Sequence, residues 1–269
     1  MRGRAAGGAP RVAARLVLAF AVALVGCNSL IYPAPQSDDN AVPDDVRVLT
    51  LMAADGVPAR ALASAGTDPQ APVIVYFHGN GNVAGDGLGL ARYVTQHGPS
   101  MLLVEYRGYG ASVKAGTPSE EGLYADAEAA LAYLRGQGVP RERVVLWGYS
   151  LGSAVAAEMA VRGHGARLVL QSPFTSIVAV GEARVPWAPV SWVLSDRFDT
   201  ASKSARIAQP TLVVHGEEDE IVPFEMGKTL AVTIPHATFL PVPGMSHSGG
   251  KQFRWVLDRI VAFVTTGAA

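Results

Sequence analysis

Hydrophobic and polar positions alternate along the chain between two kinds of segment from residue 46 onward. Short, nearly continuous apolar runs, typical of strands buried on both faces, occupy residues 73–77, 101–105, 144–147, 168–170, 211–214 and 238–240. Longer stretches with helical character lie between them, at residues 83–97, 119–136, 151–162, 224–234 and 248–265. This alternation predicts an α/β fold in which a mostly parallel, doubly wound sheet is flanked by helices.

Two segments depart from the alternation. Residues Val46 to Met52 and Pro58 to Ser64 predict an antiparallel hairpin that opens the domain. Residues 172–204 interrupt the later helices and strands with several prolines and two tryptophans, Trp187 and Trp192, which predicts a short cap. The apolar side chains of this cap are candidates to line a substrate pocket; the alternative is that they only pack the cap against the domain.

The N-terminus has the pattern of an export signal. Four arginines precede an apolar run at residues 16–25, which is too short to span a bilayer. The run ends in Leu-Val-Gly-Cys27, which resembles the lipobox of bacterial lipoproteins, and Cys27 is the only cysteine of the chain. We therefore expect a signal peptide at 1–26, a lipidated tether at 27–45 rich in Pro, Asp and Ser, and one domain at 46–269. The alternative is a buried cysteine in an N-terminal anchor helix.

Composition limits the partners. The chain of 269 residues is 49% hydrophobic and 17% charged, which is typical of a globular domain with a sizeable core. Its formal net charge is −1, and removing the four arginines of 1–26 leaves 18 basic against 23 acidic residues, or −5. No basic stripe indicates nucleic-acid binding. We expect an exported protein anchored by its lipid to a bacterial envelope membrane. In a Gram-negative cell this is the periplasmic side of the outer membrane, because Asn28 rather than Asp follows Cys27.

One motif carries the chemistry. Residues 148–152 read Gly-Tyr-Ser-Leu-Gly, directly after an apolar strand run and before a strong helix former. In this context G-x-S-x-G predicts a nucleophile elbow, a sharp strand-to-helix turn that exposes the serine hydroxyl above the sheet. Ser150 would also lie at a helix N-terminus, where the dipole favours developing negative charge. We therefore assign Ser150 as the candidate nucleophile.

A serine hydroxyl needs a base and an orienting acid, and after such an elbow they follow in the order acid, then histidine. His247 lies in a loop after the last predicted strand and before the last helix, which places it at the carboxyl edge of the sheet. The other histidines after Ser150 end a helix, precede a strand or precede the acidic segment. His247 is therefore the candidate base. The acidic segment after the strand at 211–214 offers four carboxylates, at residues 217–220.

The oxyanion of an acyl-transfer intermediate needs two hydrogen-bond donors. The backbone N–H of Leu151, directly after the nucleophile, is one candidate. The other comes from the glycine-flexible turn His78-Gly-Asn-Gly-Asn82 after the first central strand, and we choose Asn80 within it.

Together these segments resemble the α/β-hydrolase superfamily over about residues 45–265. The carboxylate segment resembles the superfamily pattern H-G-x-x-D-x-x-V-P, which implies that Asp219 is the acid, with Glu218 a distant second. The His-Gly-Asn and Tyr-Arg-Gly-Tyr-Gly pair is similar to the branch that includes acyl-protein thioesterases (depalmitoylases) and serine-aminopeptidase-like hydrolases. Glu105 departs from this branch, which usually has Asp there, and the short cap makes its substrate preference unsafe to transfer.

The resemblance implies a serine hydrolase with the α/β-hydrolase fold that cleaves a small-molecule carboxylic ester or thioester through an acyl-Ser150 intermediate, without cofactor or metal. Two alternatives stay open. A serine peptidase or amidase would use the same triad of Ser150, Asp219 and His247. A non-catalytic, lipid-anchored binding protein would keep the fold without needing all three residues. The sequence does not indicate the natural substrate or the oligomeric state.

Overall fold

The computed structural model describes residues 31–35, 41–249 and 254–268. Its centre is one eight-stranded sheet in the order β1-β2-β4-β3-β5-β6-β7-β8. The strands are β1 Val46–Met52, β2 Pro58–Ser64, β3 Val73–Phe77, β4 Ser100–Glu105, β5 Val144–Tyr149, β6 Arg167–Gln171, β7 Thr211–Gly216 and β8 Ala237–Val242. Every predicted strand run is confirmed, including the first hairpin.

The strand pairing places the candidate site residues at one edge of the sheet. β1 pairs with β2, and β2 with β4, antiparallel. All the other neighbouring strands, from β4 through β3 to β8, are parallel. Parallel strands end at the same edge of a sheet, and ligands bind in the crevice outside their carboxyl ends. The loops after β3, β5, β7 and β8 therefore meet there, which confirms the predicted α/β-hydrolase architecture.

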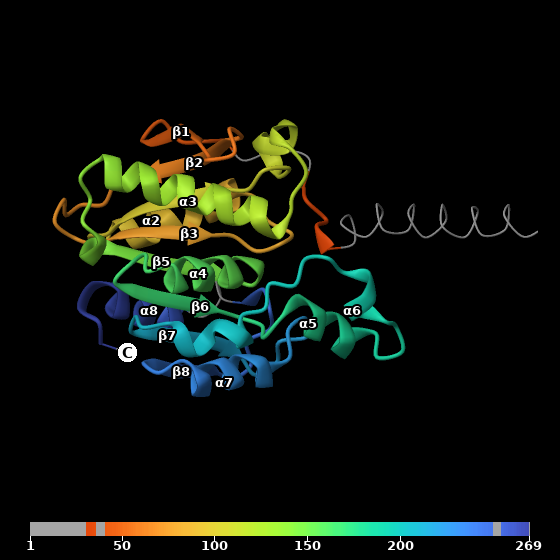
Figure 1. Cartoon of the computed structure of the whole chain (residues 1–269). Helices are drawn as coiled ribbons and strands as arrows, with labels where there is room; N and C mark the ends of the chain where they lie inside the picture. Colours follow the sequence, from red (N-terminus) through yellow and green to blue (C-terminus); the bar gives the residue numbers. More distant parts are fainter. Residues whose placement is uncertain (1–30, 36–40, 250–253, 269) are drawn as a thin grey trace, which may run out of the picture.

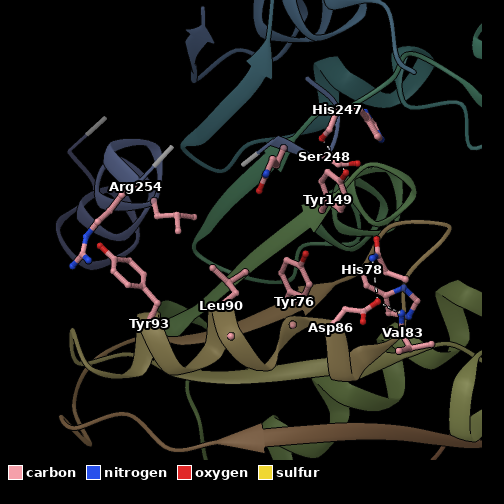
Figure 2. Close-up of a pocket in the computed structure, with 15 residues that line it drawn as sticks. Tyr76, His78, Val83, Asp86, Leu90, Tyr93, Tyr149, His247, Ser248 and Arg254 are labelled. Atoms are coloured by element: carbon pink, nitrogen blue, oxygen red, sulfur yellow. Dashed lines mark hydrogen bonds between the residues drawn. The ribbon is translucent and has the colours of Figure 1, made fainter. Parts of the chain in front are cut away.

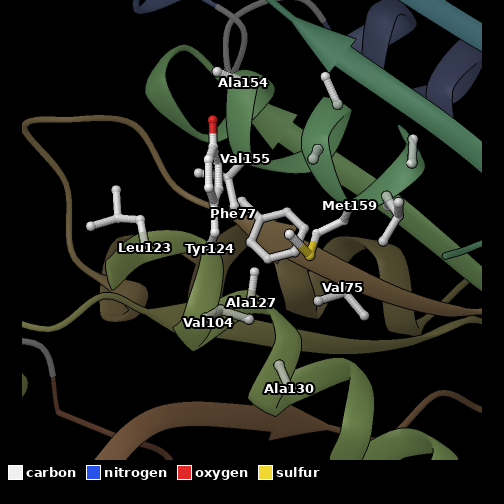
Figure 3. Packing of buried hydrophobic residues seen from close by; sticks show 14 of the residues in the cluster. Val75, Phe77, Val104, Leu123, Tyr124, Ala127, Ala130, Ala154, Val155 and Met159 are labelled. Carbon is white, nitrogen blue, oxygen red and sulfur yellow. The ribbon is translucent and has the colours of Figure 1, made fainter. Parts of the chain in front are cut away.

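Helices cover both faces of the sheet (Figure 1). α3 Glu120–Gly136, α4 Leu151–Val161 and α7 Phe224–Thr233 pack on one face, while α2 Leu88–Thr95 and α8 Arg254–Thr266 pack on the other. Successive residues of a strand point to opposite faces, so Val75 and Phe77 of β3 belong to the first core and Ile74 to the second. Figure 3 shows the first core, where the two β3 side chains meet α3 and α4. The small residues of α4 let this helix approach the sheet closely.

The last helix begins later than its predicted start at residue 248. Ser248 lies in a turn and Gly249 in the short 3-10 segment that follows, and the described part of α8 starts at Arg254. Two consecutive glycines at 249–250 disfavour a helical start here because glycine loses the most backbone entropy on ordering.

The segment between β6 and β7 forms the cap. It contains α5 Ile177–Arg184, α6 Val190–Val193 and the short 3-10 helix η4 Ala201–Arg206, and Figure 1 shows α5 and α6 beyond the carboxyl ends of the strands. Trp187 and Trp192 are 86% and 83% exposed, so they neither line a cavity nor pack against the domain. The expectation that apolar side chains of the cap line a pocket is confirmed by its aliphatic residues. The alternative, that the two tryptophans pack the cap against the domain, is wrong.

Part of the expected tether is packed against the domain. Ile31 and Tyr32 are both buried. The Tyr32 hydroxyl donates to Asp196 Oδ2 at 2.5 Å, and its ring lies edge-on to Phe198. The prediction of a free tether is therefore wrong for residues 31–35, since two large apolar side chains gain more from burial than from solvent exposure. Cys27 lies outside the described residues, and among the described residues no helix is both long and apolar enough to cross a membrane.

Candidate active site

The turn between β5 and α4 has the geometry of a nucleophile elbow. Ser150 has φ 51° and ψ −116°, in the left-handed range of φ that non-glycine residues rarely adopt. A Cβ at Gly148 would meet the Gly152 carbonyl oxygen at 2.1 Å, and one at Gly152 would meet the Phe77 carbonyl oxygen at 2.0 Å. Only glycine fits at either position. The G-x-S-x-G spacing is thus a steric requirement of the crossing between β5, α4 and β3.

His247 lies directly against the serine. Its Nε2 is 3.0 Å from Ser150 Oγ, although the two residues are 97 positions apart in the chain. The histidine loop is fixed by two contacts to its backbone: the Tyr149 hydroxyl donates to the His247 carbonyl at 3.0 Å, and Glu220 Oε2 accepts from the His247 N–H at 3.1 Å. The structure therefore brings together the predicted nucleophile and the predicted base.

Asp219 occupies the third position. His247 Nδ1 is 2.8 Å from Asp219 Oδ2 and 2.9 Å from Oδ1. A carboxylate only accepts, so Nδ1 carries the proton and Nε2 is left to accept from the Ser150 hydroxyl. The Asp219 side chain is fully buried, whereas Glu217 and Glu218 are exposed. The geometry thus selects Asp219 over Glu218.

The surroundings of Asp219 keep it charged. Burial by itself raises the pKa of this carboxyl. Hydrogen bonds from His215 and His247, together with the Val222 N–H at 2.7 Å, outweigh burial and hold the pKa of Asp219 below its ordinary value. The Ile221 N–H also donates to Oδ1, at 2.9 Å. Asp219 is therefore an anion at neutral pH that can stabilise a protonated His247.

His215 is a contact that the sequence reasoning missed. Its Nε2 lies 3.1 Å from the Val222 carbonyl and 3.2 Å from Asp219 Oδ2, and its side chain is fully buried. Since both neighbours are acceptors, Nε2 carries the proton and donates to both. Nδ1 has no hydrogen-bond partner among the described residues. The i, i+4 spacing of His215 and Asp219 after a buried strand is the sequence feature that could have indicated this contact.

The predicted oxyanion donors border the serine. Among the described residues, no hydrogen-bond acceptor lies against the backbone N–H of either Asn80 or Leu151, and both residues line the same cavity as Ser150. The Asn80 side chain is held at both polar atoms: its amide nitrogen donates one hydrogen bond to the Ile31 carbonyl, and its Oδ1 accepts from the Tyr109 hydroxyl at 2.6 Å. These contacts fix the turn, so the backbone N–H is the group that Asn80 can offer to a ligand.

The cavity above Ser150 is apolar. It has a volume of about 440 Å³, within the range of small-molecule sites. The cap supplies most of its wall, through Ile177, Val180, Gly181, Val185, Ala188, Pro189, Val190, Val193 and Leu194, and Phe174, Ile31, Ile221 and Val222 complete it. Among the residues that the structure describes, no acidic or basic side chain lines this cavity. Its walls fit an uncharged, hydrocarbon group bound next to the serine.

A second cavity of about 520 Å³ lies on the other side of His247 (Figure 2). Its walls are mixed: Figure 2 shows Tyr93 and Arg254 toward one end and His78 and Asp86 toward the other. Asp86 is engaged, since its Oδ2 accepts from the Asn82 side chain and from the Val83 N–H. Ser150 does not line this cavity, so the apolar cavity is the one that meets the nucleophile.

Glu105 stands where the resembled branch usually has Asp, and its carboxylate stabilises loops that lie away from the triad. It is fully buried and accepts from Arg60, from the Ala84 N–H and from the Ser112 N–H at 3.1–3.2 Å. Its longer side chain thus reaches two loops at once. Within the described ranges, no three His, Cys, Asp or Glu side chains gather as a metal site requires.

The chain is similar to several known proteins. The family model described as serine aminopeptidase, S33 matches residues 68–203. An uncharacterized protein of Mycobacterium tuberculosis is 40% identical over 195 residues, covering 70% of this chain and 69% of that protein. The human α/β hydrolase domain-containing protein 17B is 31% identical over 198 residues, covering 71% of this chain and 66% of that protein.

Solved structures share the fold. An esterase from Pyrococcus furiosus superposes with a TM-score of 0.71 at 16% identity, covering 86% of this chain and 97% of that one. The sheet order, the elbow and these matches define the class as an α/β hydrolase. The chain belongs to the serine aminopeptidase S33 family of this superfamily.

Proposed function

We propose that the protein is a serine hydrolase that cleaves carboxylic esters or thioesters of apolar acyl groups. The observation that carries this proposal is the chain of contacts from Ser150 Oγ to His247 Nε2 at 3.0 Å and on to buried Asp219, placed at the floor of an uncharged apolar cavity. The branch similarity to acyl-protein thioesterases supports the same substrate class.

Each step of the proposed hydrolysis can be assigned to particular residues. His247 Nε2 takes the Ser150 proton as Oγ attacks the acyl carbon, and Asp219 stabilises the imidazolium. The N–H groups of Leu151 and Asn80 hold the oxyanion; losing one such donor typically costs roughly a hundred- to a thousandfold in rate. The intermediate collapses, and His247 gives its proton to the departing alkoxide or thiolate. Water then attacks the acyl-Ser150 ester with His247 again as base, which restores the serine hydroxyl and releases the acid.

A peptidase or amidase on the same triad is the second candidate, because the matching family model is described as serine aminopeptidase. An aminopeptidase must hold the free ammonium group of its substrate next to the scissile bond, which calls for a carboxylate in the wall. The described lining residues of the cavity that meets Ser150 include no carboxylate. They therefore favour an ester or thioester of an apolar acyl group over an aminopeptidase substrate.

The decisive experiment compares wild type with Ser150→Ala. Wild type should hydrolyse p-nitrophenyl esters and react with a fluorophosphonate probe, and the variant should lose both. His164→Gln, at a partly exposed histidine paired with Glu128, is the control and should retain both. Undiminished labelling of Ser150→Ala would refute the assignment, and no labelling of wild type would favour the binding-protein alternative. A panel of acyl esters, thioesters and aminoacyl amides separates the two enzyme classes.

We further propose, from the lipobox pattern alone, that the chain is exported and lipidated at Cys27. Metabolic labelling with a palmitate analogue tests this: label should be incorporated by wild type and lost in Cys27→Ala.

A further inference from the structure

The cap and the loop after β7 carry exposed apolar side chains, which we define as the cap patch: Trp187, Trp192 and Val193 of the cap, and Ile221 of the loop after β7. Their side chains are 86%, 83%, 36% and 39% exposed. Single exposed apolar residues are ordinary, but a contiguous exposed group with large aromatics marks an interaction site. Val193 and Ile221 also line the Ser150 cavity, and each tryptophan is adjacent in sequence to a lining residue. Val193 and Ile221 therefore form part of the cavity rim, and the two tryptophans lie next to it in sequence but outside the lining.

Charged residues of both signs border the patch. The stretch 183–195 contains one arginine and no acidic residue. Arg184 and Arg197 are exposed at its two ends; Arg184 donates to the Ile221 carbonyl and Arg197 to the Ser191 carbonyl, both at 3.4 Å. Exposed carboxylates, Glu182 and Glu220, lie next to this surface in sequence as well. The two exposed tryptophans, which are residues enriched at the headgroup level of a bilayer, therefore carry the argument rather than net charge.

The path of the chain brings this surface toward a membrane. Ile31 lines the same cavity and accepts a hydrogen bond from Asn80 at the site. Figure 1 shows residues 31–35 at the same end of the molecule as α5 and α6. Ile31 is only four positions after Cys27, and four positions reach at most roughly 14 Å even when fully extended. A lipid on Cys27 would thus hold the cavity rim close to the bilayer surface.

We propose that the cap patch docks on a lipid bilayer, so that the Ser150 cavity opens to an acyl chain presented by the membrane. This inference rests on the acyl-hydrolase function proposed above, and it adds where the substrate is: a lipid-borne ester or thioester at the membrane surface. The aliphatic cap wall continues from the bilayer to the nucleophile, so the acyl group reaches Ser150 without crossing water.

The test uses the full chain reconstituted in vesicles of phosphatidylcholine with a minor share of phosphatidylglycerol. Vesicles with brominated acyl chains should quench wild-type tryptophan fluorescence, and Trp187→Phe/Trp192→Phe should lose most of that quenching. Trp255→Phe is the matched control, because Trp255 is also exposed (45%) but lies on α8 outside the cap; it should be quenched like wild type. Equal quenching of the double variant and wild type would overturn the proposal.

Turnover gives the second readout. Trp187→Ser/Trp192→Ser should hydrolyse soluble p-nitrophenyl butyrate like wild type, but should lose at least about tenfold in turnover of a vesicle-borne ester, because two large aromatic surfaces no longer enter the interface. Unchanged turnover of the vesicle-borne ester would overturn docking. If wild type hydrolyses neither ester, the proposed function fails, whereas the quenching result still decides docking. A dimer that the double substitution dissociates, without lipid quenching, would assign the patch to a second copy of the chain and also overturn the proposal.

Discussion

His215 is predicted to be a positioning residue for the catalytic acid. Its Nε2–H donates to Asp219 Oδ2 at 3.2 Å and to the Val222 carbonyl at 3.1 Å inside the fully buried region behind the triad. His215→Leu removes this donor. A hydrogen bond to a charged group contributes about 1.5–3 kcal/mol, and Asp219 keeps two backbone donors and His247. We therefore expect the lower half of that range, which corresponds to a loss of about 13-fold to 45-fold in kcat.

The assay is hydrolysis of a soluble p-nitrophenyl ester, with kcat and KM determined separately. KM should change little, because His215 does not line the Ser150 cavity. His215→Gln, whose amide can still donate, should recover most of kcat, and thermal unfolding should confirm that both variants fold. A folded His215→Leu variant with wild-type kcat would refute the role. So would an equal loss in His215→Gln, because the donor would then not be the property that matters.

Three further predictions concern the elbow, the acid and the cavity. Gly152→Ala should lower the free energy of unfolding by about 3 kcal/mol in urea titrations, because its Cβ would lie 2.0 Å from a β3 carbonyl, whereas Gly136→Ala, with open space around it, should not. Asp219→Asn should lower the free energy of unfolding most above about pH 4, where an ordinary carboxyl is ionised. Because the pKa of Asp219 is lowered in the folded protein, the difference in stability from wild type should shrink as the pH falls below about 4. A difference in stability that stays constant with pH would contradict this prediction. The ratio kcat/KM should rise with acyl length by up to about fourfold per methylene until the cavity is full; Val180→Trp in its wall should end the rise earlier, and exposed Val232→Trp should not.

The fold and the triad could be predicted because their signals are local. Central strands buried on both faces leave continuous apolar runs, and the elbow compresses strand, turn and helix into one pentapeptide around Ser150. Only the choice of Asp219 among the four adjacent carboxylates depended on the resemblance to the superfamily pattern. In the structure, its backbone places it inward while Glu217 and Glu218 remain in solvent.

The missed features depend on contacts between distant segments. Tyr32 finds its partner Asp196 more than 160 positions away, so nothing near Ile31 indicates that this stretch is packed. The outward direction of Trp187 and Trp192 also has no local signal, because composition alone does not say which face of a short, proline-rich cap points inward. His215 was overlooked for a different reason: its partner is four residues away, but its role became visible only with the geometry of Asp219.

The hydrogen bond from Asn80 to the Ile31 carbonyl has a mechanical consequence. The turn proposed to hold the oxyanion is clamped, through one side-chain amide, to the first described residue of the chain. A pulling force on the N-terminal segment would therefore act on the Asn80 turn before it reached β1, the first strand of the sheet along the chain. If the chain is anchored ahead of Ile31, tension on that anchor acts on catalytic geometry directly, and activity becomes a readout of how the domain is held.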